Sequence, residues 1–179
     1  KKLSKNNLQN LGPIKERPDD RLHRLGWRPS KFKKGSYVLI CPPSAKVMKF
    51  YGLDVDEWME NTLSELKKHT DRKLVVRLKP SRRERVTQNT IWDALKDAHC
   101  LVTFNSIAAT EALLVGTPAI ALAPNAASVL CNKNLNEVEN LNRPSIDEVH
   151  AFARHLSYCQ FTANELRSGY AWDILNEGS

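Results

Sequence analysis

The sequence predicts an α/β fold, a Rossmann-like parallel sheet flanked by helices. Short apolar runs of β-prone residues alternate with helical patterns along the chain. The stretch 100–122 holds one complete unit: an apolar run, the polar pair Asn105–Ser106, a helix of small residues that ends at Gly116, and a second apolar run after Pro118. Strand, turn, helix and strand in this order form the βαβ unit of nucleotide-binding sheets.

The other elements follow from the same patterns. Strands are expected at 36–41, 73–78, 100–104 and 119–122, and all are short apolar runs closed by proline or polar residues. Helices are expected at 54–68, 90–98, 106–115, 145–158 and 162–175. Asp54 and Ser145 are suited to cap the first turn of their helices. Trp58, Trp92 and Trp172 are expected in the core.

Length and composition indicate one globular domain without a membrane span. The chain has 179 residues, 41% of them hydrophobic, and no apolar run approaches the roughly 20 residues that cross a bilayer. Its four cysteines are widely spaced without a Cys-x-x-Cys pair, and none of the five histidines stands at metal-ligand spacing to them. We therefore expect reduced thiols, a cytoplasmic location and no metal site.

Positive charge is concentrated at the start of the chain. Residues 1–34 contain eleven Lys or Arg against three acidic residues, whereas residues 35–179 contain sixteen against seventeen. This divides the chain into a basic segment, 1–34, and a globular domain, 35–179. The segment is either a solvated linker or an arm that binds nucleic acid or another anionic surface. A second basic run covers residues 77–85.

Candidate ligand-binding residues follow three of the predicted strands. The carboxyl ends of parallel strands meet at one edge, where ligands of this fold bind. Cations and hydroxyls near a helix start suit a diphosphate, and a carboxylate suits sugar hydroxyls. These residues are Ser44, Arg77, Lys79, Asn105, Ser106, Thr110 and Glu111. Asn105 and Ser106 can equally be helix caps, Glu111 a surface residue and Lys79 a solvated strand end.

Three common nucleotide and hydrolase motifs are absent. The sequence contains no Gly-x-Gly-x-x-Gly, no Gly-x-x-x-x-Gly-Lys-Ser/Thr and no Gly-x-Ser-x-Gly. A dinucleotide site, a P-loop ATPase and an α/β-hydrolase are therefore disfavoured.

The run 102–120 resembles the nucleotide-sugar half of glycosyltransferases with two Rossmann-like domains, the GT-B architecture. Within this group, its sequence pattern is most similar to that of capsule and lipopolysaccharide sugar transferases and bacterial sialyltransferases. In those enzymes a strand-Ser-Ser-helix motif binds the donor phosphate, and a His-Pro motif faces it. Here Asn105–Ser106 and Lys79–Pro80 stand in these places. Lysine can neutralise a phosphate but is a poorer acid or base at neutral pH.

Residues 159–172 resemble the C-terminal helix of bacteriophage proteins proposed as glycosyltransferases, whose relatives include enzymes that modify DNA bases. The resemblance implies a GT-B-type C-terminal domain that uses a nucleotide sugar, with UDP-sugar favoured, and that needs no metal. It implies a hydroxylated base in phage DNA as acceptor. The DNA contacts would be Lys33, Lys34, Arg82 and Arg83.

Two alternatives stay open beside this interpretation. One is transfer to a capsule or lipopolysaccharide glycan, and the other is a non-catalytic nucleic-acid-binding module with a Rossmann-like core. For an enzyme, the resemblance also implies a second Rossmann-like domain that binds the acceptor and supplies the catalytic base. Residues 1–34 would then be the linker to that domain or its remnant.

Overall fold

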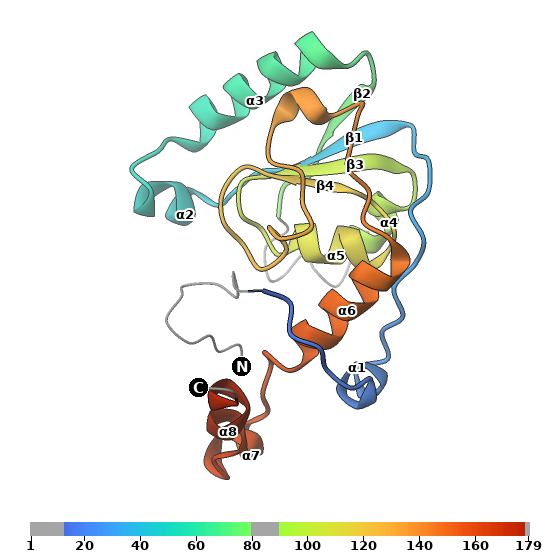
Figure 1. The fold of residues 1–179 in the computed structure, drawn as a ribbon. Coiled ribbons are helices and arrows are strands. Elements are labelled where there is room, and N and C mark those ends of the chain that lie inside the picture. Colours follow the sequence, from blue (N-terminus) through green and yellow to red (C-terminus); the bar gives the residue numbers. More distant parts are fainter. Residues whose placement is uncertain (1–12, 80–89, 178–179) are drawn as a thin grey trace.

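The computed structural model describes residues 13–79 and 90–177, which contain a four-stranded parallel sheet (Figure 1). Its strands are β1 (Tyr37–Cys41), β2 (Lys73–Val76), β3 (Ala98–Thr103) and β4 (Ala119–Ala121). Their order across the sheet is β2-β1-β3-β4, and every neighbouring pair is parallel. The predicted α/β, Rossmann-like fold is therefore confirmed.

Helices cover both faces of the sheet (Figure 1). On one face lie α3 (Val55–His69) and the short 3-10 helix η2 (Leu135–Glu137); on the other lie α4 (Ile91–Leu95), α5 (Ala108–Leu114) and α6 (Ile146–Ser157). Successive residues of a strand point to opposite faces. Val38 and Ile40 accordingly pack in the α3 layer, and Leu39 packs in the α5 and α6 layer. Each face thus has its own apolar core.

Local capping chemistry fixes the starts of the longer helices. The Asp54 carboxylate accepts hydrogen bonds from the backbone N–H groups of Asp56 and Glu57, at 2.8 and 3.0 Å. Ser145 and Glu148 form a reciprocal capping box at the start of α6. Both starts agree with the sequence prediction.

Some elements differ from the prediction. The loop after β1 contains a short helix, α2 (Ala45–Phe50). The expected helix 162–175 is two helices, α7 (Ala163–Arg167) and α8 (Tyr170–Asn176), because Gly169 between them adopts the left-handed conformation with φ 83°. Trp172 on α8 is 71% exposed, so its assignment to the core was wrong.

Residues 13–34 pack against the domain and include a short helix, α1 (Asp20–Arg24), which lies beside α6 (Figure 1). The backbone N–H groups of Ser30 and Lys33 donate to the carbonyls of Leu114 and Gly116. A Cβ on Gly116 would stand 2.1 Å from the backbone oxygen of Lys31, so only glycine fits this approach. This part of the basic segment is folded onto the domain; its link to an upstream domain stays a prediction.

Candidate functional site

The connections that follow β1 and β3 lead to opposite faces of the sheet. The chain leaves β1 toward α2 and α3 on one face and leaves β3 toward α5 on the other. This makes the gap between β1 and β3 the topological switch point, where doubly wound sheets bind their ligands. The two strand ends are held together because the Thr103 hydroxyl donates to the Cys41 carbonyl at 2.8 Å.

Two side chains of opposite charge, Arg77 and Glu111, affect the pKa of Cys41 at the end of β1. Burial raises the pKa of the Cys41 thiol to about 12; the positive charge of Arg77 lowers this pKa, and the negative charge of Glu111 raises it. Both are half-buried candidates from the sequence, and they come from different loops. The fold therefore brings a cation and a carboxylate to the same end of the switch point, as a ligand with phosphate and hydroxyl groups requires.

Asn105 and Ser106 form the polar tip that follows β3. Both are half-buried. The Ser106 hydroxyl accepts a hydrogen bond from the backbone N–H of Ala108 at 3.2 Å, whereas the Asn105 amide makes no side-chain hydrogen bond within residues 13–79 and 90–177. The helix begins at Ala108, two residues later than predicted. The Ser106 hydroxyl thus bonds within the turn before α5, whose N-cap residue is Ile107, and the Asn105 amide can serve a ligand.

The other predicted donor-binding residues are placed less favourably. Thr110 is only 7% exposed, so little of it can touch a ligand. Ser44 is exposed and caps α2, where its hydroxyl accepts from the Val47 N–H at 3.4 Å. Lys79 is exposed and lies three residues beyond the end of β2. Arg77, Asn105, Ser106 and Glu111 therefore make up the centre of the candidate site.

Aromatic side chains beside this site were missed by the sequence analysis. Tyr51 follows α2 and lies edge-on to the buried Phe104, with ring centroids 5.1 Å apart. Phe50 is 76% exposed next to it. These rings belong to the loop after β1, so they adjoin the switch point. The missed signal was α2, which was interpreted as an irregular loop.

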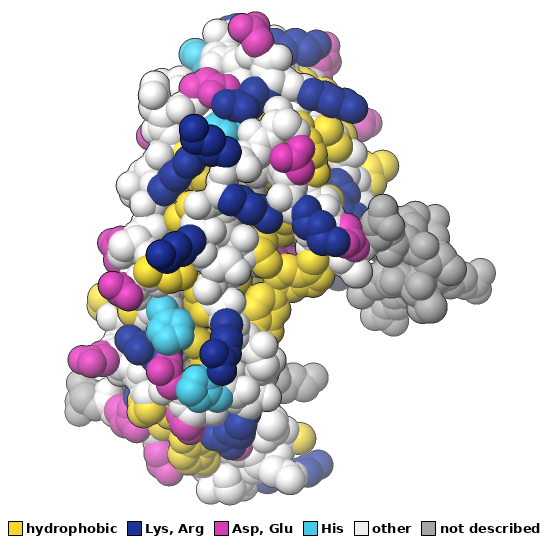
Figure 2. All heavy atoms as spheres, turned by 90° about the vertical axis from the view of Figure 1, so that its right-hand side faces the viewer, with side chains coloured by type: hydrophobic (Ala, Val, Ile, Leu, Met, Phe, Trp, Pro, Cys, Tyr) yellow, Lys and Arg dark blue, Asp and Glu magenta, His cyan; other side chains and the backbone are white. Residues whose placement is uncertain are grey.

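The predicted DNA contacts do not gather at the switch point. Lys33 and Lys34 precede β1 and therefore lie at the amino-terminal edge of the sheet, opposite Asn105 and Glu111. Figure 2 looks onto this side of the molecule and shows many Lys and Arg side chains spread over it. Arg82 and Arg83 lie outside the described residues.

Within residues 13–79 and 90–177, no helix is long and apolar enough to span a bilayer. No three His, Cys, Asp or Glu side chains among them gather as a metal-binding group.

Comparisons with known proteins gave one kind of match. No family model and no curated protein matches the sequence. A solved structure similar to the chain is that of Thermosulfurimonas dismutans KpsC, a beta Kdo 2,4 transferase, with 16% identity and a TM-score of 0.48. The match covers 82% of this chain, which spans 58% of the KpsC chain. At this identity and TM-score the likeness says nothing of activity.

Proposed function

We propose that the chain is the nucleotide-sugar-binding domain of a glycosyltransferase, of the GT-B type. The observation that carries this proposal is that Arg77 follows β2 while Asn105, Ser106 and Glu111 follow β3, the two strands that flank β1, and that the charges of Arg77 and Glu111 both affect the pKa of Cys41 at the end of β1. The resemblance of the run 102–120 to the donor-binding motif of these enzymes supports it independently.

In the proposed mechanism, the domain holds the donor and stabilises its leaving group. Arg77 and the Asn105 amide contact the diphosphate and stabilise the negative charge that develops on the departing nucleotide. Glu111 accepts hydrogen bonds from ribose or sugar hydroxyls. A carboxylate of a second Rossmann-like domain deprotonates the acceptor hydroxyl. The proposal invokes no divalent metal, because Arg77 and the amide already serve the leaving group.

A binding experiment tests this proposal directly. UDP-, GDP- and CMP-sugars are titrated into the protein, and binding is followed by calorimetry and by the shift in melting temperature. We expect one class, with UDP favoured, to bind. Glu111→Gln should bind that donor about tenfold more weakly or worse, since it loses charged hydrogen bonds. Glu60→Gln, the same change on the exposed side of α3, should bind normally.

Two results would overturn the proposal. One is the absence of binding by all three donor classes, which the non-catalytic alternative predicts. The other is donor binding by Glu111→Gln that equals the wild type. Either result would leave the Rossmann-like architecture without a donor site at this edge.

The acceptor is a separate question within this proposal. A hydroxylated base in DNA was predicted from the basic residues, but Lys33 and Lys34 lie at the edge opposite the switch point. They are therefore poorly placed to hold a DNA base that reacts there. Competition between duplex DNA and capsule or lipopolysaccharide oligosaccharides for the protein distinguishes the two acceptor classes. Measuring DNA binding by the double variant Lys33→Ala/Lys34→Ala shows whether DNA binds through these lysines.

A further inference from the structure

A groove separate from the candidate donor site runs beside α3. Its volume is about 520 Å³, within the roughly 300–1,000 Å³ range of small-ligand pockets. Apolar side chains from α2, from the residue after β4 and from η2 line it: Met48, Leu122 and Leu135. The polar lining comes from α3 and its N-cap residue Asp54. Arg77, Asn105, Ser106 and Glu111 are not part of this lining.

Trp58 supplies an aromatic surface in this groove. It is half-buried and lies edge-on to Phe104, with ring centroids 6.4 Å apart and the planes at 82°. Because the ring packs against other apolar side chains, little rotamer freedom remains to be lost on binding. An indole combines a flat apolar face with an N–H donor. Such a surface suits a ligand that has both C–H faces and hydroxyls.

A row of polar groups follows the same side of α3. Thr62 lines the groove, is only 3% exposed, and its hydroxyl makes no hydrogen bond within the described part of the chain. Asn61 and Glu57 line it too, are exposed, and have side chains without a partner in the same described ranges. Residues 57 and 61 are four positions apart and so share one face of the helix, and Thr62 lines the groove beside Asn61.

These groups offer both donors and acceptors. The Asn61 amide does both, the Thr62 hydroxyl does both, and the Glu57 carboxylate accepts. The Thr62 hydroxyl makes no hydrogen bond to another described residue, so it is available to bond to a ligand in the groove. The matching ligand is rich in hydroxyls.

The charges in the groove exclude phosphate-rich ligands. Asp54, Glu57 and Glu65 line it against a single cation, Lys68, whose ammonium is 2.7 Å from Glu65. A nucleotide or nucleic acid would meet net negative charge here. Neutral ligands avoid this repulsion.

From these observations we infer that the α3 groove binds a neutral saccharide. The inference does not depend on the proposed donor site, because no lining residue is shared. If both hold, the chain has two sugar-recognition sites, one for an activated donor and one for a neutral glycan unit.

The test is a titration with neutral disaccharides in the absence of nucleotide. Maltose, cellobiose and chitobiose are added separately while the Trp58 indole N–H and Asn61 side-chain amide resonances are followed by NMR; Trp58→Phe assigns the indole signal. We expect one disaccharide to shift both resonances in a saturable way. Asn61→Ala should weaken binding about fivefold, as expected for one lost hydrogen bond.

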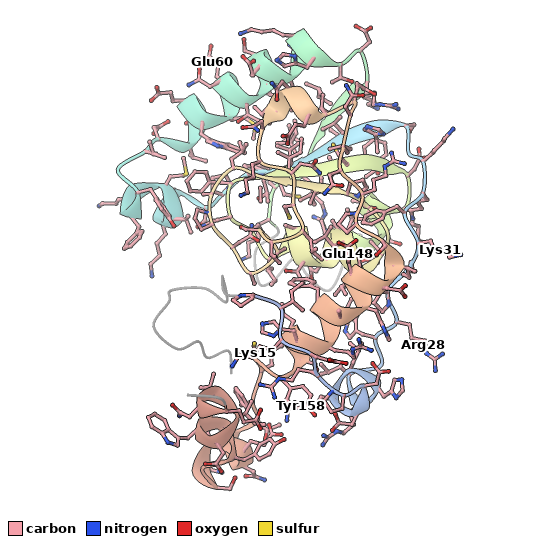
Figure 3. The ribbon with its side chains drawn as sticks, viewed as in Figure 1. Lys15, Arg28, Lys31, Glu60, Glu148 and Tyr158 are labelled. Atoms are coloured by element: carbon pink, nitrogen blue, oxygen red, sulfur yellow. The ribbon has the colours of Figure 1, made fainter. Side chains whose placement is uncertain are left out.

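A matched control is available on the same helix. Glu60 is exposed and does not line the groove, and Figure 3 shows it on the outer side of α3. Glu60→Gln should bind the disaccharide as the wild type does. Asn61 is also exposed, so its replacement by Ala is expected to leave the fold intact.

Three outcomes would overturn the inference. The first is no saturable shift with any of the three disaccharides up to their solubility limits. The second is equal affinity of Asn61→Ala and wild type. The third is a Lys-rich peptide that saturates the same resonances when the sugars do not, which would make the groove a site for a basic peptide. Donor binding by Asn61→Ala is measured in parallel, so failure here is distinguishable from failure of the donor site.

Discussion

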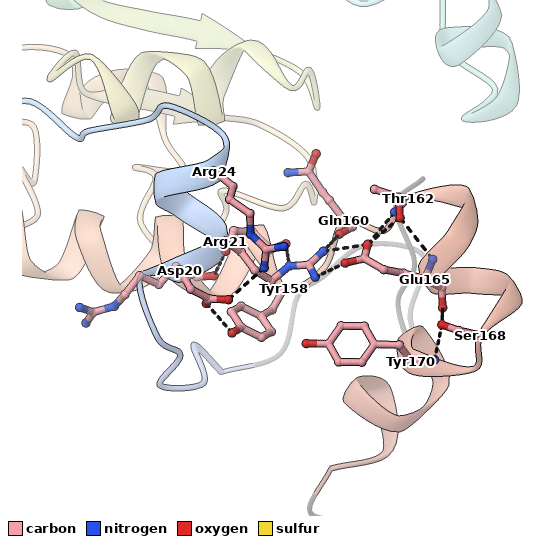
Figure 4. A network of polar contacts seen from close by, with 11 residues as sticks. Asp20, Arg21, Arg24, Tyr158, Gln160, Thr162, Glu165, Ser168 and Tyr170 are labelled. Carbon is pink, nitrogen blue, oxygen red and sulfur yellow. Dashed lines mark hydrogen bonds and ion pairs between the residues drawn. The ribbon is translucent and has the colours of Figure 1, made fainter.

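Replacing Arg21 by Met tests how strongly the amino-terminal segment is joined to the domain (Figure 4). The Arg21 guanidinium donates to the Ser157 carbonyl at 3.0 Å, to the Gln160 carbonyl, and to the Glu165 carboxylate at 2.6 Å. It also lies over the ring of Tyr158, 5.2 Å from its centroid. One side chain of α1 thereby connects the end of α6 with α7.

The expected loss of stability can be estimated from these contacts. Side-chain exposure is 9% for Arg21 and 21% for Glu165, so this is a largely buried ion pair. Removing one partner of such a pair costs about 3–5 kcal/mol. Because Glu165 keeps its bonds to Thr162 and some contact with water, we expect the lower end, about 3 kcal/mol. In a chain of this length that loss lowers the melting temperature by roughly 6–12 °C.

The assay is thermal and urea unfolding of Arg21→Met beside Arg24→Met. Arg24 is on the same helix, but its side chain is 68% exposed and pairs only with Asp20 among the described residues, so its loss should cost about 0.5 kcal/mol or less. Glu165→Gln and the double variant complete a thermodynamic cycle, which should reveal coupling between the two residues. If Arg21→Met melted like Arg24→Met, or if the cycle showed no coupling, the reasoning would be refuted.

The same pair predicts a pH dependence. The hydrogen bond from Arg21 lowers the pKa of Glu165 from 4.5 to about 2. A carboxyl group whose pKa is depressed by folding adds stability above its unfolded pKa and loses it as the pH falls toward its folded pKa. The stability difference between wild type and Arg21→Met should therefore be largest above pH 4.5 and shrink toward pH 2. Urea midpoints across this range check it, and a constant difference would contradict it.

Three other predictions concern single positions. Gly116→Ala should be strongly destabilised in thermal unfolding, because φ is 74° and the new Cβ would stand 2.1 Å from the Lys31 carbonyl oxygen; normal melting would contradict the packing of residues 13–34. Ser145→Ala should lower the melting temperature by roughly 2–4 °C, because the capping box with Glu148 is lost. The Cys41 thiol, with its pKa raised to about 12 by burial, should be alkylated by iodoacetamide far more slowly in native than in unfolded protein, as mass spectrometry would measure.

Elements with strong local signals were predicted well. β3 is buried on both faces and contains the apolar run Cys100–Val102. α6 begins at a capping box in which Ser145 and Glu148 stand three positions apart, a spacing that is visible in the sequence. Short elements without such signals were not. α2 is six residues long, too short for a periodic pattern, and α1 depends on the burial of Arg21 by residues more than 130 positions away. No local rule predicts a buried arginine of that kind.

In the candidate site, too, the features with a local sequence signal were predicted and those that depend on tertiary packing were not. The strand-turn-helix pattern placed Asn105 and Ser106 at a strand tip, as the structure has them. Arg77 and Glu111 both affect the pKa of the Cys41 thiol because β1 lies between β2 and β3 in the sheet. The sequence did not determine this strand order. The burial of Thr110 likewise depends on how α5 is rotated on the sheet.

The position of the basic segment changes what its charge can do. Lys33 and Lys34 lie before β1, and the five residues of that strand span about 16 Å at roughly 3.3 Å per residue. The Debye length at physiological salt is about 8 Å, so these lysines are largely screened from an anion at the switch point. Their charge can attract a polyanion to the amino-terminal edge but adds little to the affinity for a donor diphosphate. Under the proposed function, donor binding therefore depends on the few groups at the carboxyl edge, and Arg77 and Glu111 matter more to it than the net charge of +7.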